Sequence, residues 1–237
     1  MLTLFFVDSL PTAKGSNFEF VGDDALHAIK ALRMNVGEIF NLSNGKGAWS
    51  RVEALEVDKK SILVKVIESG FEEPLATTLT VIQAVPKGDR VKESIELSTE
   101  GGADRIIMWQ AARSIGKIAD KNEKLQITAR ESSKQSRRFR IPEVQTLQTS
   151  EITELFSTFD AVLICHESAT AGISQSLSGD EKSVAIVIGP EGGLTDGEVE
   201  AFIGAGGRLV VMGRPVLRSA HAGLAALSAV NTALSLW

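Results

Sequence analysis

Cysteine and histidine are scarce in this chain, and their scarcity excludes several kinds of site. Cys165 is the only cysteine among 237 residues, so an internal disulfide and a four-cysteine zinc site are both impossible. The three histidines, His27, His166 and His221, have no spacing typical of metal ligands, and we expect no bound metal. A single thiol also fits the reducing cytoplasm, which is the compartment that we predict.

Simple catalytic motifs and long apolar segments are also lacking. The motif Gly-x-Ser-x-Gly is absent, and no Ser-His-Asp or Cys-His arrangement follows from the spacing. The stretch Met1–Val7 is too short for a signal peptide, and Asp8 follows it directly. The longest uncharged stretch, Ser219–Trp237, contains polar residues and many alanines, which favours a buried or interface helix over a membrane span. We therefore expect no membrane association.

Positive charge is in deficit overall but concentrated locally. The net charge is −5, which argues mildly against bulk binding of nucleic acid. The segment Arg130–Arg140, however, carries five cations against one acid, together with Phe139. Such a segment could grip an RNA backbone and stack on a base, although a solvated helix end explains it equally well. Lys87, Arg90 and Lys92 form a second, smaller basic group.

The pattern of predicted elements divides the chain into two domains. Residues 1–70 combine short β-forming segments with one helix and a hairpin turn at Asn44–Gly47, which predicts a small β-barrel-like domain. Gly70–Leu75 has the composition of a linker. In 76–237 strands alternate with helices, which predicts an α/β domain whose parallel sheet is covered on both faces. Its predicted strands are Thr80–Val85, Ile106–Trp109, Ala161–Cys165, Val184–Ile188 and Leu209–Met212, and its helices are Val91–Glu100, Lys121–Arg138, Glu151–Phe156, Glu198–Ile203 and Ala220–Leu234.

A glycine-rich turn, Gly189–Gly193, follows the predicted strand Val184–Ile188 and opens into a helix; it is called the glycine turn below. Glycines allow positive φ and a close approach of the backbone to a ligand, and Thr195 with Glu198 has the spacing of a helix capping box. A glycine turn before a helix often binds phosphate, but Glu191 would repel phosphate and no Walker lysine follows. An acidic turn suits a ligand with hydroxyls, amines or positive charge, such as S-adenosylmethionine. The competing interpretation is a tight turn that only leads into a capped helix.

A second unusual turn, Met212–Ala222, also leaves a short apolar strand and enters a helix. It places Arg218 near the start of that helix, where a cation is unfavourable with the helix dipole. We infer that Arg218 has a separate task or an acidic partner, although an ordinary surface arginine is the duller explanation. Two such turns predict two walls of one small-molecule pocket.

Several motifs, taken in order, resemble those of the small-subunit ribosomal RNA uridine-N3 methyltransferases of the SPOUT class (RsmE type), over almost the whole chain. The glycine turn matches that family without change, and Leu217 and Arg218 match part of its last motif. The other matching stretches are His27–Arg33 with Val36–Glu38, Gln83–Arg90, Thr99–Gly102, Arg113–Ser114, and Gln135–Ser136 with Arg138 and Pro142. Some family positions differ here, since Gly101 stands for leucine, Lys134 for glutamate and Arg137 for glycine.

The resemblance implies a deep trefoil knot in the C-terminal domain, a PUA-like RNA-binding domain at the N-terminus, and a homodimer with shared active sites. It implies methylation of N3 of a uridine in 16S ribosomal RNA, as free RNA or in the small ribosomal subunit, with S-adenosylmethionine as the cofactor. The residues expected to bind the cofactor are Cys165, His166, Ile188, Gly189, Pro190, Glu191, Gly192, Gly193, Met212, Gly213, Val216, Leu217, Arg218 and Ala222. Those expected to bind RNA are Arg33, Lys87, Arg90, Lys134, Arg137, Arg138 and Arg140.

Catalysis is assigned to Arg218, because negative charge on the uracil oxygens during attack by N3 calls for a nearby cation. The family commonly has Leu-Arg-Thr-Glu-Thr-Ala where this chain has Ala220 and His221 after Ser219, so the role of the family's glutamate does not carry over. The general base is unassigned, with His221 a weak candidate. Three alternatives stay open: another SPOUT activity such as 2′-O-ribose methylation, a ribosome assembly protein without catalysis, and a nucleotide-phosphate enzyme, which Glu191 disfavours.

Overall fold

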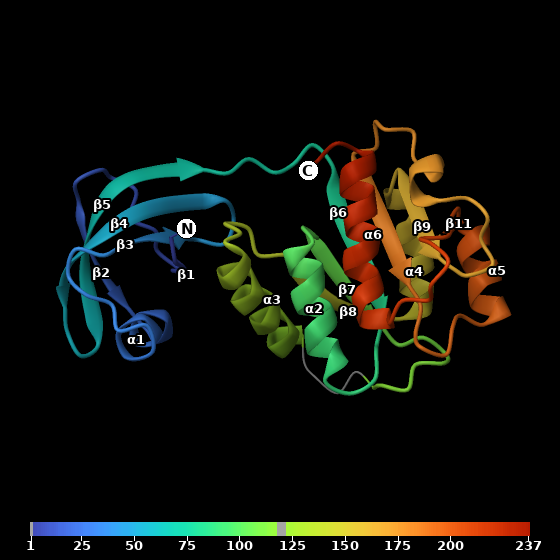
Figure 1. Ribbon diagram of the computed structural model, residues 1–237, viewed down its shortest axis with the longest axis horizontal. Coiled ribbons are helices and arrows are strands. Elements are labelled where there is room, and N and C mark those ends of the chain that lie inside the picture. Colours follow the sequence, from blue (N-terminus) through green and yellow to red (C-terminus); the bar gives the residue numbers. More distant parts are fainter. Residues whose placement is uncertain (1, 118–121) are drawn as a thin grey trace. The chain divides into compact units, whose positions relative to one another are not determined.

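The structure is a computed structural model that describes residues 2–117 and 122–237. The chain forms two compact units, one made of Met1–Pro74 with Ser133–Ile141, the other of Leu75–Ser132 with Pro142–Trp237 (Figure 1). The sequence pattern places a border between residues 70 and 76. It does not predict that a second stretch of chain joins the first unit.

The first unit is built around a five-stranded sheet in the order β1-β3-β4-β5-β2. The rings of Phe5, Phe20 and Phe40 meet in its core, with centroids 5.4–5.8 Å apart. One helix, α1, adds Ala25 and Ala28 to this core. With β1 and β2 at the edges of this order, the unit is the β-rich domain with one helix that the sequence predicts. The elements are β1 (Leu4–Phe6), β2 (Asn17–Val21), α1 (Asp23–Lys30), β3 (Ile39–Ser43), β4 (Ala48–Val57) and β5 (Ser61–Phe71).

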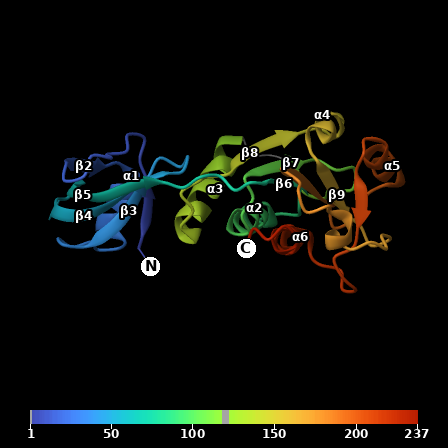
Figure 2. The same ribbon diagram turned by 90° about the horizontal axis from the view of Figure 1, so that it is seen from above.

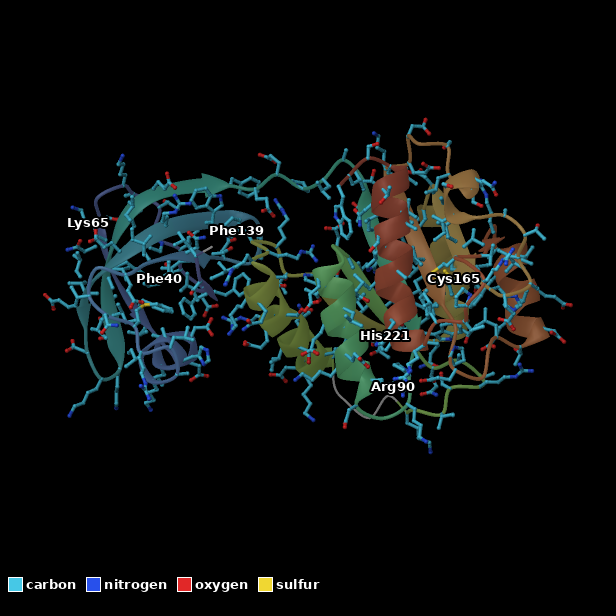
Figure 3. All side chains as sticks on the ribbon, viewed as in Figure 1. Phe40, Lys65, Arg90, Phe139, Cys165 and His221 are labelled. Atoms are coloured by element: carbon cyan, nitrogen blue, oxygen red, sulfur yellow. The ribbon has the colours of Figure 1, made fainter. Side chains whose placement is uncertain are left out.

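The segment Ser133–Ile141 joins the first unit through a buried ion pair and an aromatic stack. Nζ of Lys134 lies 2.7 Å from Oδ1 of Asp24, and both side chains are buried. The ring of Phe139, labelled in Figure 3, stacks on Trp49 with the centroids 5.5 Å apart. Nη2 of Arg140 donates a hydrogen bond of 2.6 Å to the carbonyl oxygen of Glu72. These contacts explain why the segment belongs to a unit whose other residues all precede position 75.

The second unit contains a six-stranded parallel sheet in the order β11-β9-β10-β6-β7-β8. Most of its strands are continuous apolar runs, as expected for strands buried on both faces. The strands are β6 (Thr78–Ala84), β7 (Arg105–Trp109), β8 (Glu143–Leu147), β9 (Ala161–Cys165), β10 (Ser183–Ile188) and β11 (Arg208–Val210). The helices are α2 (Arg90–Glu100), α3 (Asn122–Ser136, whose last residues belong to the first unit), α4 (Thr149–Leu155), α5 (Asp196–Gly204) and α6 (Ser219–Ala233), with short 3₁₀ turns η1 (Phe156–Thr158) and η2 (Ile173–Ser176).

Helices cover both faces of the parallel sheet, as the sequence predicts. Figure 2 shows α2 and α6 on one side of the strands and α4 and α5 on the other. On the α4 and α5 side, Trp109 packs edge-on against Phe202, with centroids 5.3 Å apart, in a cluster that includes Ile152. On the other side α6 lies next to α2 and contacts β6 and β10. This second layer brings the start of α6 to the middle of the sheet.

Four elements differ from the sequence prediction. The strands β2 and β8 are not predicted at all, and β5 extends through Phe71 into the predicted linker. The predicted helix Lys121–Arg138 corresponds to α3, with Lys121 outside the described residues and Arg137 already in a left-handed conformation, φ 61°. No described helix is long and apolar enough to cross a membrane.

A buried carboxylate fixes the loop that leads into β10. Burial alone would raise the pKa of Glu181, but the hydrogen bonds that its carboxylate accepts from the backbone and hydroxyl of Ser178 and from Gly179 outweigh it and lower the pKa to about 2. The backbone carbonyl of Glu181 also accepts the hydroxyl proton of Thr77 at 2.7 Å. The ionised side chain therefore holds this loop in place.

Replacing Glu181 with glutamine is expected to lower the free energy of unfolding by about 2 kcal/mol at neutral pH, because a lowered pKa means that folding favours the carboxylate. That contribution is complete above the ordinary carboxyl pKa near 4.5 and is lost as the pH falls toward about 2. Urea unfolding between pH 7 and pH 3 measures the difference from wild type, which should shrink over this window. Asp180→Asn, which changes an exposed neighbouring carboxylate, is the control; an equal loss in both variants would contradict the assignment.

Candidate active site

The candidate site lies at the carboxyl ends of the parallel strands, where ligands of open α/β sheets bind. The glycine turn follows β10, and the turn that contains Met212 follows β11. Between these strands lies β9, which ends at Cys165, and on the other side of β10 lies β6, which leads to Lys87. Because the strands are parallel, all four of these chain ends emerge at the same edge of the sheet.

A cavity of about 910 Å³ lies between the two turns. It is lined by every residue that the sequence analysis assigns to the cofactor, and also by Glu167, Leu194, Val210, Val211, Arg214, Pro215 and Ser219. The two turns, which α5 and β11 separate in the sequence, therefore form walls of one pocket, as the sequence predicts. Figure 3 labels Cys165 at this part of the second unit.

The glycine turn is closed by local hydrogen bonds and a buried leucine. The backbone N–H of Gly193, which has φ 72°, donates to the carbonyl oxygen of Pro190 at 2.9 Å. The side chain of Leu194 packs beneath the turn so closely that a Cβ at Gly189 would lie 3.2 Å from it. Thr195 and Glu198 form the predicted capping box at the start of α5. The turn is thus both a strand end and a helix start.

The loop after β7 is hydrogen-bonded to the glycine turn and to the first turn of α5. The carboxylate of Glu198 accepts the backbone N–H of Ala112 at 2.8 Å. The guanidinium of Arg113 donates to the carbonyl oxygens of Gly192 and Leu194, at 3.3 and 3.2 Å. Arg113 belongs to one of the matching stretches found in the sequence, but only the structure shows that its side chain binds the glycine turn. Both contacts limit the movement of the turn relative to the sheet.

The start of α6 is also hydrogen-bonded to the glycine turn. The hydroxyl of Ser219 donates to the carbonyl oxygen of Gly189 at 2.8 Å, and Nε2 of Gln83 donates to that hydroxyl oxygen at 2.9 Å. Ser219 and Gln83 are both buried. The sequence does not indicate these contacts, because a serine at a helix start is common and its partners are distant in sequence.

Arg218, the residue assigned to catalysis, precedes α6 as its N-cap and lines the cavity. Its guanidinium is exposed, and among the described residues no acidic side chain pairs with it. An acidic partner, one of the two explanations from the sequence, is therefore not found within 2–117 and 122–237. Val216 and Leu217 beside it are exposed as well, with Val216 at 88%.

Glu191 is engaged with the loop between β6 and α2. Its carboxylate accepts the backbone N–H of Lys87 at 3.3 Å and lies 3.7 Å from Nη1 of Arg90, which Figure 3 labels. This arrangement brings two predicted RNA-binding residues beside the cavity. It also means that the negative charge of Glu191 is partly compensated by Arg90 and by the Lys87 amide.

Cys165 and His166 line the cavity, whereas His221 lies outside it. Burial raises the pKa of Cys165 to about 12, so its thiol is neutral. Nδ1 of His166 lies 2.8 Å from the hydroxyl of Ser168 and accepts its backbone N–H at 3.2 Å, which leaves Nε2 to carry the proton of the neutral ring. His221 does not line the cavity; its Nε2 lies 3.1 Å from a carboxylate oxygen of Glu93 on α2.

The remaining residues predicted to contact RNA lie in the first unit. Arg33 is exposed in a left-handed conformation, φ 54°, while Arg137 and Arg138 are partly buried. Arg140 lies over the ring of Phe71, 5.1 Å from its centroid. Lys134 must be removed from the set, because it is 8% exposed and its ammonium is paired with Asp24.

No group of three or more His, Cys, Asp or Glu side chains in the described ranges is arranged to hold a metal ion. The site is therefore described by its cavity, its fixed glycine turn and its cations. The chemistry it supports is the binding of a medium-sized polar organic molecule beside a positively charged rim.

Comparisons with known proteins agree along the whole chain. A family model described as an RNA methyltransferase domain matches residues 72–231, and one described as an RNA methyltransferase PUA domain matches residues 22–67. The ribosomal RNA small subunit methyltransferase E of Mycobacterium bovis is 34% identical, covering 99% of this chain and 93% of the relative. The protein of the same name from Bacillus subtilis is 31% identical, covering 97% and 93%. The crystal structure of the Neisseria gonorrhoeae enzyme of that name, bound to S-adenosyl methionine, has a TM-score of 0.86 at 22% identity, covering 100% of this chain and 98% of that chain.

Proposed function

Because the chain belongs to the RNA methyltransferase family that includes the ribosomal RNA small subunit methyltransferases E, we propose that it methylates N3 of a uridine in 16S ribosomal RNA with S-adenosylmethionine. The observation that carries the proposal is the single cavity that joins the glycine turn, the Met212 turn and Arg218. Its substrate is the RNA or the small ribosomal subunit, in the cytoplasm.

The residues of the cavity fit S-adenosylmethionine. Its volume of about 910 Å³ lies within the usual range for sites that enclose ligands of this size, about 300–1,000 Å³. Ile188, Leu194 and Val210 supply apolar walls for an adenine ring, and the two turns supply backbone groups for polar ends. The neutral Cys165 thiol tolerates an apolar neighbour, and Nε2–H of His166 can donate to an acceptor of the ligand.

Methyl transfer needs alignment and charge stabilisation more than covalent help. S-adenosylmethionine supplies the activated methyl group. Uracil N3 must lose its proton before or during attack, and negative charge then develops on the ring oxygens. The exposed guanidinium of Arg218 stabilises that charge, since Arg218 lines the cavity and lies at the start of a helix. Lys87 and Arg90, at the same end of the sheet, position the RNA backbone.

Two further features belong to the proposal. The trefoil knot is supported by the path of the chain, which runs from the edge strand β11 back across the sheet to α6, packed on β6 and β10. A homodimer is supported by exposed apolar side chains at the site and at the end of the chain, Val216 at 88% and Trp237 at 64%. Sedimentation equilibrium measures the oligomeric state; a monomer at micromolar concentration would refute the dimer.

Labelled S-adenosylmethionine should transfer its methyl group to small ribosomal subunits from a strain that lacks the modification. Digestion to nucleosides is expected to yield 3-methyluridine. A 2′-O-methylated nucleoside would instead assign the other SPOUT chemistry. Cofactor binding by calorimetry without any methylated product would favour an assembly protein without catalysis.

A further inference from the structure

A chain of two hydrogen bonds crosses the second unit from β6 to the glycine turn. Nε2 of Gln83 donates to Oγ of Ser219 at 2.9 Å and to the carbonyl oxygen of Ala84 at 2.9 Å. Oγ of Ser219 donates in turn to the carbonyl oxygen of Gly189 at 2.8 Å. Gln83 and Ser219 lie 136 positions apart in sequence, and both are buried. We call these three groups the Gln83–Ser219–Gly189 relay.

The direction of the relay is determined by its ends. The Gly189 carbonyl can only accept a hydrogen bond, so the single proton of the Ser219 hydroxyl points toward it. The hydroxyl oxygen then accepts from Gln83. The Gln83 amide cannot be turned around without placing its oxygen against the Ala84 carbonyl. Every proton in the relay therefore has one position.

The relay connects two parts of the site that no shared loop joins. Gly189 begins the glycine turn, and Ser219 follows Arg218 directly at the start of α6. Arg218 is exposed and, within the described residues, has no side-chain partner of its own, whereas its neighbours Ser219 and Ala220 are buried. The position of the Arg218 backbone relative to the glycine turn thus depends on the hydrogen bond from Ser219 to Gly189.

Ordinary helix packing is the competing explanation, and Ser98 on α2 provides a test of it. Its hydroxyl is buried against the same helix, 3.3 Å from where a Cβ at Gly223 would lie, but it has no hydrogen-bond partner in the described structure. Ser98 and Ser219 are therefore both buried serines that face α6 or belong to it, and only Ser219 bonds the turn. Removing each hydroxyl separates packing from the relay.

We propose that Ser219 is a positioning residue, which through the Gln83–Ser219–Gly189 relay sets the glycine turn and Arg218 in register with one another. The expected change in kcat rests on the proposed methyltransferase function. The expected change in the exchange of the glycine turn does not. The relay acts before any substrate binds, since all its members belong to the chain itself.

The test compares Ser219→Ala with Ser219→Thr, which keeps the hydroxyl, and with Ser98→Ala. Amide hydrogen exchange of residues 189–195 is measured on the cofactor-free protein, followed by kcat and by the Kd for S-adenosylmethionine. Ser219→Ala is expected to speed exchange of the turn about tenfold, because the Gly189 carbonyl loses the Ser219 donor and Gln83 loses one of its two acceptors. At saturating cofactor kcat should still fall about tenfold, since misplacement of Arg218 is not repaired by binding. Ser219→Thr should retain most of both properties, and Ser98→Ala should match wild type.

The proposal is overturned if residues 189–195 of Ser219→Ala exchange at the wild-type rate. It is also overturned if Ser98→Ala speeds their exchange as much as Ser219→Ala does. If Ser219→Ala does not fold, Gln83→Met tests the same relay from its other end and should produce a smaller change in the same direction. A wild-type protein that transfers no methyl group would refute the proposed function, while the exchange measurements would still decide the relay.

Discussion

Replacing Arg218 with alanine is expected to lower kcat for methyl transfer about 10²–10³-fold, the usual effect of removing one preorganised group that stabilises developing charge. The affinity for S-adenosylmethionine should change much less, because the cavity keeps its apolar walls and both turns. Single-turnover kinetics at saturating cofactor, with calorimetry for the Kd, separate the two quantities. Arg218→Lys should recover part of the rate, since it restores a positive charge without the planar geometry.

The neighbouring Arg214 offers a matched control for Arg218. It lines the same cavity and is also exposed, but it lies in the turn rather than at the start of α6. Arg214→Ala should keep kcat within a few-fold of wild type. Equal losses of kcat and of cofactor affinity in Arg218→Ala would show that the guanidinium binds the cofactor rather than stabilising charge on the uracil.

Replacing Lys134 with methionine is expected to destabilise the first unit by about 3–5 kcal/mol, because it removes one partner of a buried ion pair and keeps the buried carboxylate of Asp24. Nζ of Lys134 lies 2.7 Å from Asp24, whose other oxygen accepts the backbone N–H of Phe6 at 3.1 Å. Thermal and urea unfolding of the full chain measure the loss. Asp24→Asn combined with Lys134→Met should recover much of it, since both charges of the buried pair are then removed.

A Lys134→Met protein as stable as wild type would show that the buried ion pair contributes nothing to folding. The same variant also tests the corrected RNA assignment. At temperatures where it remains folded, its affinity for RNA should equal that of wild type, because the Lys134 ammonium is not at the surface. Arg140→Ala provides the comparison, since Arg140 is one of the predicted RNA contacts that stays partly exposed.

The sequence predicts the cavity between the two turns well because its signals are local. Glycine conformations, the Thr195–Glu198 capping box and short apolar strands each depend on a few adjacent residues. The parallel sheet then brings the two turns together, since all its strands end at one edge. Their lining of one cavity follows from topology, which alternating strands and helices already indicate.

The parts that escape prediction depend on distant partners or weak patterns. Lys134 reads as one more cation of a basic run, and only its contact with a residue 110 positions earlier shows that it is buried. The role of Ser219 depends likewise on Gln83. The strand β8 is a polar edge strand with little apolar content, whereas Phe18 and Phe20 of β2 carry an alternating pattern that could have been recognised.

The two-part composition of the first unit has a consequence for the order in which the protein is made. Its sheet is complete at residue 71, yet Lys134 and Phe139 are synthesised some sixty or more positions later. During translation Asp24 is therefore made long before Lys134, its counter-ion. The strands β6 and β7 of the parallel sheet are synthesised in between. A fragment that stops at the linker lacks this closure, so an expression plasmid for the N-terminal half has to extend to Ile141 to give the complete fold.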